Sequence, residues 1–248
     1  MLNHPTIEKL LALRLPAMAR GLREQMDNPE MTSLSFEERL GLLVDREWTE
    51  RENARLKRRL RAAKLRHAAC LEDIDYRATR GLDRPLLAKL ADSQWLRQGY
   101  NVLITGPTGA GKSYLACALA QKACRNGFAA LYIRMPRLFQ DLQAARGDGT
   151  YPKLLAELAK KPLLVLDDWG LAPFTDEARR DLLEIVEERH PERPTIIASQ
   201  LPVEEWHASI GDPTLADAIL DRIVHRAFKL KLKGGSMRKE REPEGGLE

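Results

Sequence analysis

The sequence predicts an α/β fold, in which a parallel sheet of five strands lies between layers of helices, and an all-helical N-terminal domain before it. After residue 100, short apolar runs alternate with longer amphipathic segments, which is typical of a parallel sheet covered on both faces. Before residue 75, apolar residues recur only at helical intervals. A chain of 248 residues with 44% hydrophobic residues is long enough to bury such a core.

The N-terminal domain, expected to span residues 1–70, contains two helical patterns. The first places apolar residues at roughly helical intervals over residues 7–19. The second opens at a capping box formed by Ser35 and Glu38, and we expect this helix to continue to Ala69. Both patterns predict helices without any strand.

The α/β domain is expected to occupy residues 71–240. Its strands are predicted at 102–104, 130–133, 163–166, 195–198 and 228–232. Its helices are predicted at 85–90, 112–125, 136–145, 153–160, 176–189 and 216–224. The last residues, 241–248, are polar and rich in glycine, and we expect them to be disordered.

The composition excludes several classes of protein. No stretch reaches the ~18 apolar residues of a membrane helix, and the first residues lack the basic and apolar blocks of a signal peptide. Three cysteines without CxxC spacing are typical of a reducing compartment. The five histidines lie too far apart in the sequence for a local zinc site. We therefore expect a soluble protein of the cytoplasm with no membrane partner.

The net charge of +4 conceals two basic blocks. Residues 46–66 contain nine basic and three acidic residues, and residues 222–241 contain eight basic and one acidic residue. Such blocks on an otherwise acidic chain favour a polyanionic partner such as nucleic acid, although the first block is also compatible with a solvated helix face. The candidate DNA-binding residues in the first block are Arg51, Arg55, Lys57, Arg58, Arg59 and Arg61.

The segment from Gly106 to Ser113 matches the phosphate-binding pattern G-x-x-x-x-G-K-[ST]. It follows a predicted strand and opens a predicted helix, which is the context that this motif requires. Glycines allow successive backbone N–H groups to point at phosphate oxygens, while Lys112 neutralises phosphate charge and Ser113 binds Mg²⁺. The motif predicts that a nucleoside triphosphate contacts Gly106, Pro107, Thr108, Gly109, Ala110, Gly111, Lys112, Ser113 and Tyr114.

Two carboxylates, Asp167 and Asp168, end the predicted strand at 163–166 in the manner of a Walker B motif. Parallel sheets place ligands at the carboxyl ends of their strands, so we expect both acids beside the phosphate loop. Asp167 is the candidate Mg²⁺ ligand, and Asp168 is the candidate group that polarises the attacking water. The strand at 130–133, inserted between the two motifs, is typical of ATPase-like P-loop proteins, and no Asn-Lys-x-Asp motif supports a GTPase.

Polar residues after the later strands are further candidates for the catalytic site. Ser199 and Gln200 lie at the tip of the predicted strand at 195–198, and either side chain could orient the attacking water. Arg238 follows the last predicted strand and could reach the phosphates of its own subunit, or it could belong to a solvated basic tail.

Arg222 lies in the predicted helix at 216–224. An arginine at this position could contact the γ-phosphate bound by a neighbouring subunit, a role worth roughly 10³–10⁵ in rate. The alternative is an ion pair within the chain, with Asp217 or Asp221.

Five segments together resemble the IstB family of transposition helper ATPases, which belongs to the AAA+ class beside the helicase loader DnaC and the initiator DnaA. The resemblance covers nearly the whole chain. Two of the segments, Ala-Ser-Gln-Leu-Pro and Ala-Asp-Ala-Ile-Leu-Asp-Arg, are more specific than the phosphate loop. The five segments are 106–116, 163–170, 198–202 with Trp206, 216–225 and 235–238.

The resemblance implies an AAA+ ATPase that uses ATP and Mg²⁺. It assigns the Walker A roles to Lys112 and Ser113, the Mg²⁺ role to Asp167, sensor 1 to Ser199, the arginine finger to Arg222 and sensor 2 to Arg238. Asp168 stands where many AAA+ proteins carry a glutamate, which implies slow, switch-like hydrolysis.

The resemblance also implies partners: ATP-dependent homo-oligomers that bind duplex DNA and act on the transposase encoded by the same element. One departure concerns the helical lid domain usual in AAA+ proteins, because only about sixteen residues follow Leu232. We therefore expect no full lid.

Three alternative functions remain open at the level of sequence. A helicase loader of the DnaC type would share the ATPase core, but it would act on a replicative helicase and favour single-stranded DNA. A small-molecule phosphotransferase would act without any effect of DNA. A DNA-coating protein would use the nucleotide only to control its assembly.

Overall fold

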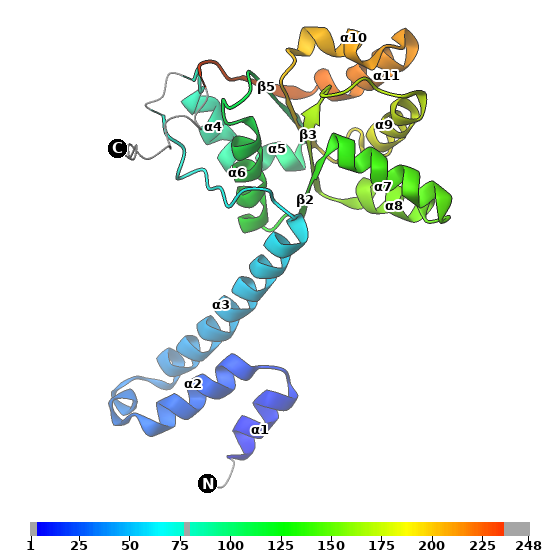
Figure 1. Ribbon diagram of the computed structural model, residues 1–248. Coiled ribbons are helices and arrows are strands. Elements are labelled where there is room, and N and C mark those ends of the chain that lie inside the picture. Colours follow the sequence, from blue (N-terminus) through cyan, green and yellow to red (C-terminus); the bar gives the residue numbers. More distant parts are fainter. Residues whose placement is uncertain (1–3, 77–79, 236–248) are drawn as a thin grey trace, which may run out of the picture. The chain divides into compact units, whose positions relative to one another are not determined.

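The computed structural model describes residues 4–76 and 80–235, and the chain divides into two compact units, Met1–Arg58 and Arg59–Glu248 (Figure 1). The division falls inside the long helix α3 (Phe36–Ala63), upstream of the domain boundary expected at residue 70. The last turn of α3 belongs to the second unit, within which Arg59 Nε donates a hydrogen bond to the carbonyl of Cys124 at 2.9 Å.

The N-terminal unit is helical, as predicted. The periodic pattern over residues 7–19 covers two helices instead of one, because the chain turns at Arg14, whose φ of 59° is left-handed. Pro16 then begins the next helix, where its fixed φ is favourable and its missing N–H costs nothing. The elements are α1 (Pro5–Ala12), α2 (Pro16–Asp27), the short 3₁₀ helix η1 (Pro29–Ser33) and α3.

Helix α3 begins at the predicted capping box. The backbone N–H of Ser35 donates to the Glu38 carboxylate at 2.8 Å, and the Glu38 N–H donates to Ser35 Oγ at 3.2 Å. The helix ends at Ala63 and not at the expected Ala69, because Lys64 adopts a left-handed conformation with φ of 51°. The residues that follow have no regular secondary structure before α4 among those described.

The second unit confirms the predicted parallel sheet of five strands. The spatial order is β2-β3-β4-β1-β5, and every neighbouring pair is parallel. Each strand lies within a few residues of its predicted position: β1 (Asn101–Thr105), β2 (Ala130–Arg134), β3 (Leu163–Trp169), β4 (Thr195–Ser199) and β5 (Ala227–Lys231).

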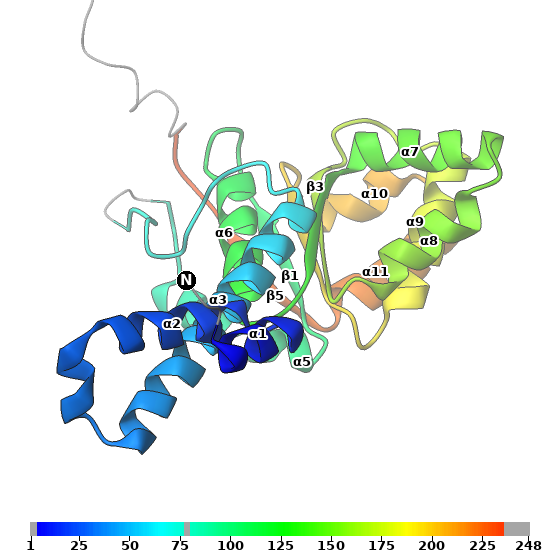
Figure 2. The same ribbon diagram turned by 90° about the horizontal axis from the view of Figure 1, so that it is seen from below.

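Helices cover both faces of this sheet. Figures 1 and 2 show α4, α5 and α6 on one face, with α7 to α11 on the other. The short helices α5 and α10 and the 3₁₀ turn η2 (Val203–Glu205) are absent from the sequence prediction, since segments this short carry too few apolar repeats. The helices are α4 (Arg84–Ala91), α5 (Gln94–Arg97), α6 (Lys112–Arg125), α7 (Met135–Gly147), α8 (Tyr151–Lys160), α9 (Asp176–Arg189), α10 (Trp206–Ile210) and α11 (Pro213–Val224).

One hydrophobic core of the second unit lies between the sheet and the helices α7 to α11. Side chains of β3 and β4, such as Leu166 and Ile197, are buried against these helices. Trp169, at the end of β3, stacks on Trp206 with ring centroids 4.7 Å apart. Burial of each such side chain contributes about 1.5–3 kcal/mol, so packing fixes the carboxyl ends of the central strands.

A close backbone approach fixes the opposite, amino-terminal edge of the sheet. Gly99, just before β1, has a φ of 70°, and a Cβ at this position would lie 1.9 Å from the carbonyl oxygen of Pro191. Only glycine satisfies both conditions here. Among the described residues, no helix has the length and apolar character needed to cross a membrane.

Candidate functional site

The carboxyl ends of three adjacent strands, β3, β4 and β1, meet around one cavity. The phosphate loop follows β1, the two predicted acids end β3, and residue 200 follows β4. The cavity has a volume of about 220 Å³. Its lining includes Arg66, Thr108, Gly109, Lys112, Ser113, Arg134, Asp167, Asp168, Leu171, Ala198 and Gln200.

The phosphate loop adopts a conformation that glycines make possible. Gly106, Gly109 and Gly111 have φ values of 148°, 84° and 94°. At Gly106 a Cβ would also lie 2.5 Å from the carbonyl oxygen of Leu232, which follows β5. The loop leads directly into α6 at Lys112, so its backbone N–H groups and the positive end of the helix dipole are available to an anion.

The ammonium group of Lys112 lies in this loop. The side chain is 9% exposed, and Nζ donates to the carbonyl of Pro107 at 2.9 Å. Burial lowers the pKa of Lys112, while the negative charges of Asp167 and Asp168 act in the opposite direction. An ammonium has three N–H donors, so the bond to Pro107 leaves capacity for phosphate oxygens.

Asp167 is held in one orientation by two donors. Its carboxylate accepts a hydrogen bond from the Tyr132 hydroxyl at 2.5 Å and another from the Asp168 backbone N–H at 2.9 Å. Burial and this hydrogen bond raise the pKa of Tyr132, which keeps the phenol protonated as a donor. The carboxylate is 1% exposed and lines the same cavity as the Ser113 side chain. Such oxygen donors fit Mg²⁺, which prefers one or two carboxylates together with phosphate oxygens.

Asp168 is the strained residue of the site. Its φ of 63° is unusual for a residue other than glycine, and the pairing of β3 with β4 is irregular between Leu166 and Trp169. The turned backbone directs the carboxylate to Arg134, whose Nε donates to it at 2.5 Å. The counter-charge of Asp168 raises the pKa of Arg134. Sequence reasoning missed this partner.

Tyr132 and Arg134 could have been inferred from strand order. Both lie on β2, which pairs with β3 so that Tyr132 is opposite Val165 and Arg134 is opposite Asp167. The sequence contains both strands but does not say that they are neighbours. Once that pairing is known, a polar side chain at the end of β2 must lie beside the acids of β3.

The structure separates the two candidates at the end of β4. Ser199 is fully buried, and its hydroxyl donates to the carbonyl of Trp169 at 3.0 Å and accepts the N–H of Leu201 at 3.0 Å. These bonds join β4 to β3 and do not bring the hydroxyl into the cavity. Gln200 does line the cavity, and its side-chain oxygen accepts a hydrogen bond from Thr108 Oγ1 at 2.8 Å.

Arg222 lies at the other edge of the sheet from the phosphate loop. The Asn101 amide, at the first residue of β1, donates to the backbone carbonyls of Arg222 and Ile223 at 3.2 and 3.0 Å. The loop begins after the last residue of β1, roughly 13 Å further along at ~3.3 Å per residue. The Arg222 guanidinium donates to Glu187 at 2.8 Å, a partner that differs from the aspartates considered in the sequence. Arg238 lies outside the described residues.

Three of the five candidate DNA-binding arginines are engaged within the chain. Arg51 Nε donates to Glu47 at 2.7 Å, and its Nη2 donates to the carbonyl of Arg14 at 2.5 Å. Arg55 Nη1 donates to Glu52 at 2.5 Å. Arg59 donates to the Cys124 carbonyl, as described above. These contacts reduce the positive charge that this part of α3 offers to an external anion.

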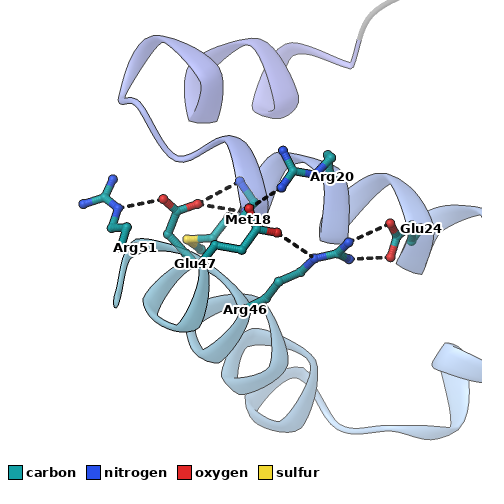
Figure 3. A network of polar contacts seen from close by, with 8 residues as sticks. Met18, Arg20, Glu24, Arg46, Glu47 and Arg51 are labelled. Carbon is teal, nitrogen blue, oxygen red and sulfur yellow. Dashed lines mark hydrogen bonds and ion pairs between the residues drawn. The ribbon is translucent and has the colours of Figure 1, made fainter. Parts of the chain in front are cut away.

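A network of ion pairs and hydrogen bonds joins α2 to α3 and accounts for the first part of the basic block (Figure 3). Glu47 accepts hydrogen bonds from the backbone N–H groups of Ala17 and Met18 at 2.8 and 3.1 Å, and it thereby caps α2. Ion pairs also join Arg46 to Glu24 and Arg20 to Glu50. The role of these charges is therefore to hold the N-terminal unit together.

Three basic residues further along α3 remain exposed. Among the described residues, no hydrogen bond or ion pair engages the side chains of Lys57, Arg58 or Arg61. Their spacing of three and four residues places them on one side of the helix. Exposed basic side chains of this kind can contact a phosphate backbone.

The chain is similar to known proteins over nearly its full length. A sequence profile of the IstB-like ATP binding proteins matches residues 8–244. The insertion sequence ATP-binding protein y4pL of Sinorhizobium fredii is 54% identical over 96% of this chain and 98% of its own length. The ATP-binding protein of insertion sequence IS1162 from Pseudomonas fluorescens is 52% identical over 86% of this chain and 93% of its own.

Solved structures show the same fold at lower identity. The crystal structure of DnaI superposes with a TM-score of 0.58 and 22% identity, over 66% of this chain and 91% of the DnaI chain.

Proposed function

The chain belongs to the family of IstB-like ATP-binding proteins, and on this basis we propose that it is an AAA+ ATPase that assembles on duplex DNA with ATP and assists a transposase. The observation that carries the proposal is the position of two groups relative to the sheet. Lys112 and the acids Asp167 and Asp168 lie at its carboxyl edge, whereas Arg222 lies at its amino-terminal edge. Each subunit therefore carries, at opposite edges of its sheet, the two sets of groups that would form ATPase sites with its neighbouring subunits.

The carboxyl edge supplies the groups that bind ATP. The loop N–H groups and Lys112 bind the phosphates, and Gln200 orients the attacking water beside the γ-phosphate. Mg²⁺, held by Ser113 and Asp167, neutralises phosphate charge when bound. Asp168 accepts the proton of that water after the ion pair between Arg134 and Asp168 has opened. An aspartate is one carbon shorter than glutamate, and its ion pair must open first, so hydrolysis is slow unless assembly assists it.

The amino-terminal edge supplies the group that acts on a neighbour. Arg222 exchanges its bond to Glu187 for the γ-phosphate held by the next subunit. Both partners of the present ion pair are partly exposed, so the exchange costs little, about 1 kcal/mol or less. The trans contact makes assembly depend on the triphosphate and completes the catalytic site.

The exposed surface formed by Lys57, Arg58 and Arg61 supplies the contact with DNA. Phosphate contacts give affinity that is independent of sequence and falls with salt. Alignment of this surface in an oligomer would multiply the contacts along a duplex. The insertion-sequence relatives give the context in which such an assembly acts, so the expected protein partner is the transposase of the same element.

The DNA contact is tested with the full chain by changing Lys57, Arg58 and Arg61 together to Gln. The log–log dependence of duplex affinity on salt should become shallower by about 0.9 per lost contact, or roughly 2.7 for three contacts. A control with Lys153, Lys160 and Arg180 changed to Gln alters the net charge equally on exposed positions of α8 and α9. Equal slopes for the two triple variants would refute the assignment of this surface.

A further inference from the structure

The segment that connects α3 to the ATPase core contributes a side chain to the nucleotide cavity. Arg66 lies three residues beyond the end of α3 and lines the cavity together with Lys112 and Asp167. Its guanidinium lies beside the Tyr132 hydroxyl and opposes the rise in the pKa of that phenol. Because the Tyr132 hydroxyl donates to Asp167, Arg66 lies close to the candidate Mg²⁺ ligand.

The backbone around Arg66 is fastened to the helix that begins at the phosphate loop. The backbone of Arg66 and His67 lies beside the Cys117 thiol on α6 and opposes the rise in the pKa of that thiol, and the His67 ring lies 6.3 Å from the Tyr114 ring on the same helix. On its other side the segment is continuous with the last turn of α3, which Arg59 holds to Cys124 at the end of α6. A movement of the Arg66 backbone is therefore coupled to a movement of the last turn of α3.

The charges of the cavity favour a phosphate as the partner of Arg66. Arg134 is already paired with the carboxylate of Asp168, and Lys112 belongs to the phosphate loop. Arg66, by contrast, lies beside a neutral phenol, and among the described residues its side chain makes no ion pair, so an anion can take this guanidinium without breaking one. The phosphate nearest to the acids of β3 is the terminal one, because the loop backbone binds the inner phosphates.

We propose that Arg66 binds the γ-phosphate of ATP within its own subunit and thereby reports the nucleotide state to α3. The proposal rests on the ATPase function given above. ATP draws the guanidinium from Tyr132 to the terminal phosphate and tightens the segment against α6. ADP leaves the guanidinium on the phenol. The last turn of α3, the helix that contains Lys57, Arg58 and Arg61, is then held more tightly against α6 in the ATP state than in the ADP state.

The first test compares the affinities of the full chain for ATP and ADP, with Mg²⁺, using fluorescent nucleotides. Arg66→Gln should weaken ATP binding about tenfold, the order expected for one charge-assisted hydrogen bond, and change ADP binding less than threefold. Arg66→Lys, which keeps the charge, should recover part of the loss. Arg180→Gln, on an exposed part of α9, is the control and should bind both nucleotides like the unchanged protein.

The same experiment distinguishes the two levels of the account. If Lys112→Ala binds ATP as well as the unchanged protein does, the proposed ATPase site itself is wrong. If Lys112→Ala loses ATP while Arg66→Gln keeps the original ratio of ATP to ADP affinity, the role of Arg66 is refuted and the ATPase site stands.

The second test measures the coupling to α3 by amide hydrogen exchange of residues 59–70. A non-hydrolysable ATP analogue should protect these amides more than ADP does in the unchanged protein. Arg66→Gln should abolish the difference between the two nucleotides while its ADP state exchanges normally, which separates a sensing role from a loss of folding. Protection that is equal in ATP and ADP, or a difference that survives in Arg66→Gln, would overturn the proposal.

Discussion

Replacement of Glu47 by Ala should destabilise the N-terminal unit much more than the same change at Glu50. Both acids lie on α3 and contact residues of α2. The Glu47 side chain is 8% exposed, whereas that of Glu50 is 46% exposed. Glu47 accepts three hydrogen bonds, two of them from the first turn of α2. The residue before that helix, Leu15, has no polar side chain that could replace this cap.

The magnitude follows from these contacts. Glu47→Ala leaves two N–H groups of a helix terminus without their acceptor and removes the partner of Arg51, at a cost of about 2 kcal/mol for a lost cap with a charged acceptor. Glu50 makes only exposed ion pairs, with Arg20 and Arg46, so its loss should cost about 0–1 kcal/mol. Glu47→Gln, which keeps an acceptor oxygen but no charge, should fall between the two.

Hydrogen exchange of the α2 amides in the full chain measures the effect, and about 2 kcal/mol corresponds to roughly 30-fold faster exchange. The hydrogen bonds from Arg51, Met18 and Ala17 outweigh the opposing effect of burial and lower the pKa of Glu47 in the folded chain. The stabilisation by Glu47 is therefore fully present above the pKa that its carboxyl has in the unfolded chain. It is lost as the pH falls through the lower pKa of the folded chain. If Glu47→Ala and Glu50→Ala exchange at the same rate, the capping role is refuted.

Three other changes test separate parts of the account. Gln200→Ala should lower the rate of ATP hydrolysis by about 10²-fold with little effect on the free energy of unfolding. Ser199→Ala should instead lower the free energy of unfolding by about 1–2 kcal/mol, measured with urea. The reverse pattern would assign the orientation of the water to Ser199. Glu187→Gln frees Arg222 and should lower the protein concentration needed for ATP-dependent assembly up to about fivefold, measured by light scattering. Arg222→Ala should prevent assembly. If neither effect is seen, Arg222 forms only an ion pair within its own chain. Gly99→Ala places a Cβ against the Pro191 carbonyl and should lower the free energy of unfolding by at least about 2 kcal/mol, and a neutral result would contradict the close backbone approach.

The sheet was predictable from the sequence because its strands are buried on both faces. The apolar runs of β1, β3 and β4 stand out against the amphipathic helices between them, and the phosphate loop fixes the direction of the first strand. The approximate ranges predicted for α6 and α9 coincide with the observed helices. Boundaries that depend on one backbone conformation, such as the left-handed Arg14 and Lys64, were not, since neither residue type signals such a turn.

The site was only partly predictable, because its partners come from segments that are distant in sequence. The phosphate loop and the two acids are continuous motifs, so their residues could be named. Tyr132, Arg134 and Arg66 carry no motif and become recognisable only from the strand order and the path of the chain after α3. Similarly, composition marked a basic block but could not show that Glu47 and Glu52 already pair with Arg51 and Arg55.

In the proposed function, ATP and duplex DNA together drive assembly through the two edges of the sheet. This assembly is tested most directly by light scattering of the full chain with duplex or single-stranded DNA, in ATP with Mg²⁺ or in ADP. We expect large complexes only with ATP and duplex, and none for Arg222→Ala under the same conditions. A particle size that ignores nucleotide and DNA, or that responds only to single strands, would contradict this expectation, and the second result would favour a helicase loader.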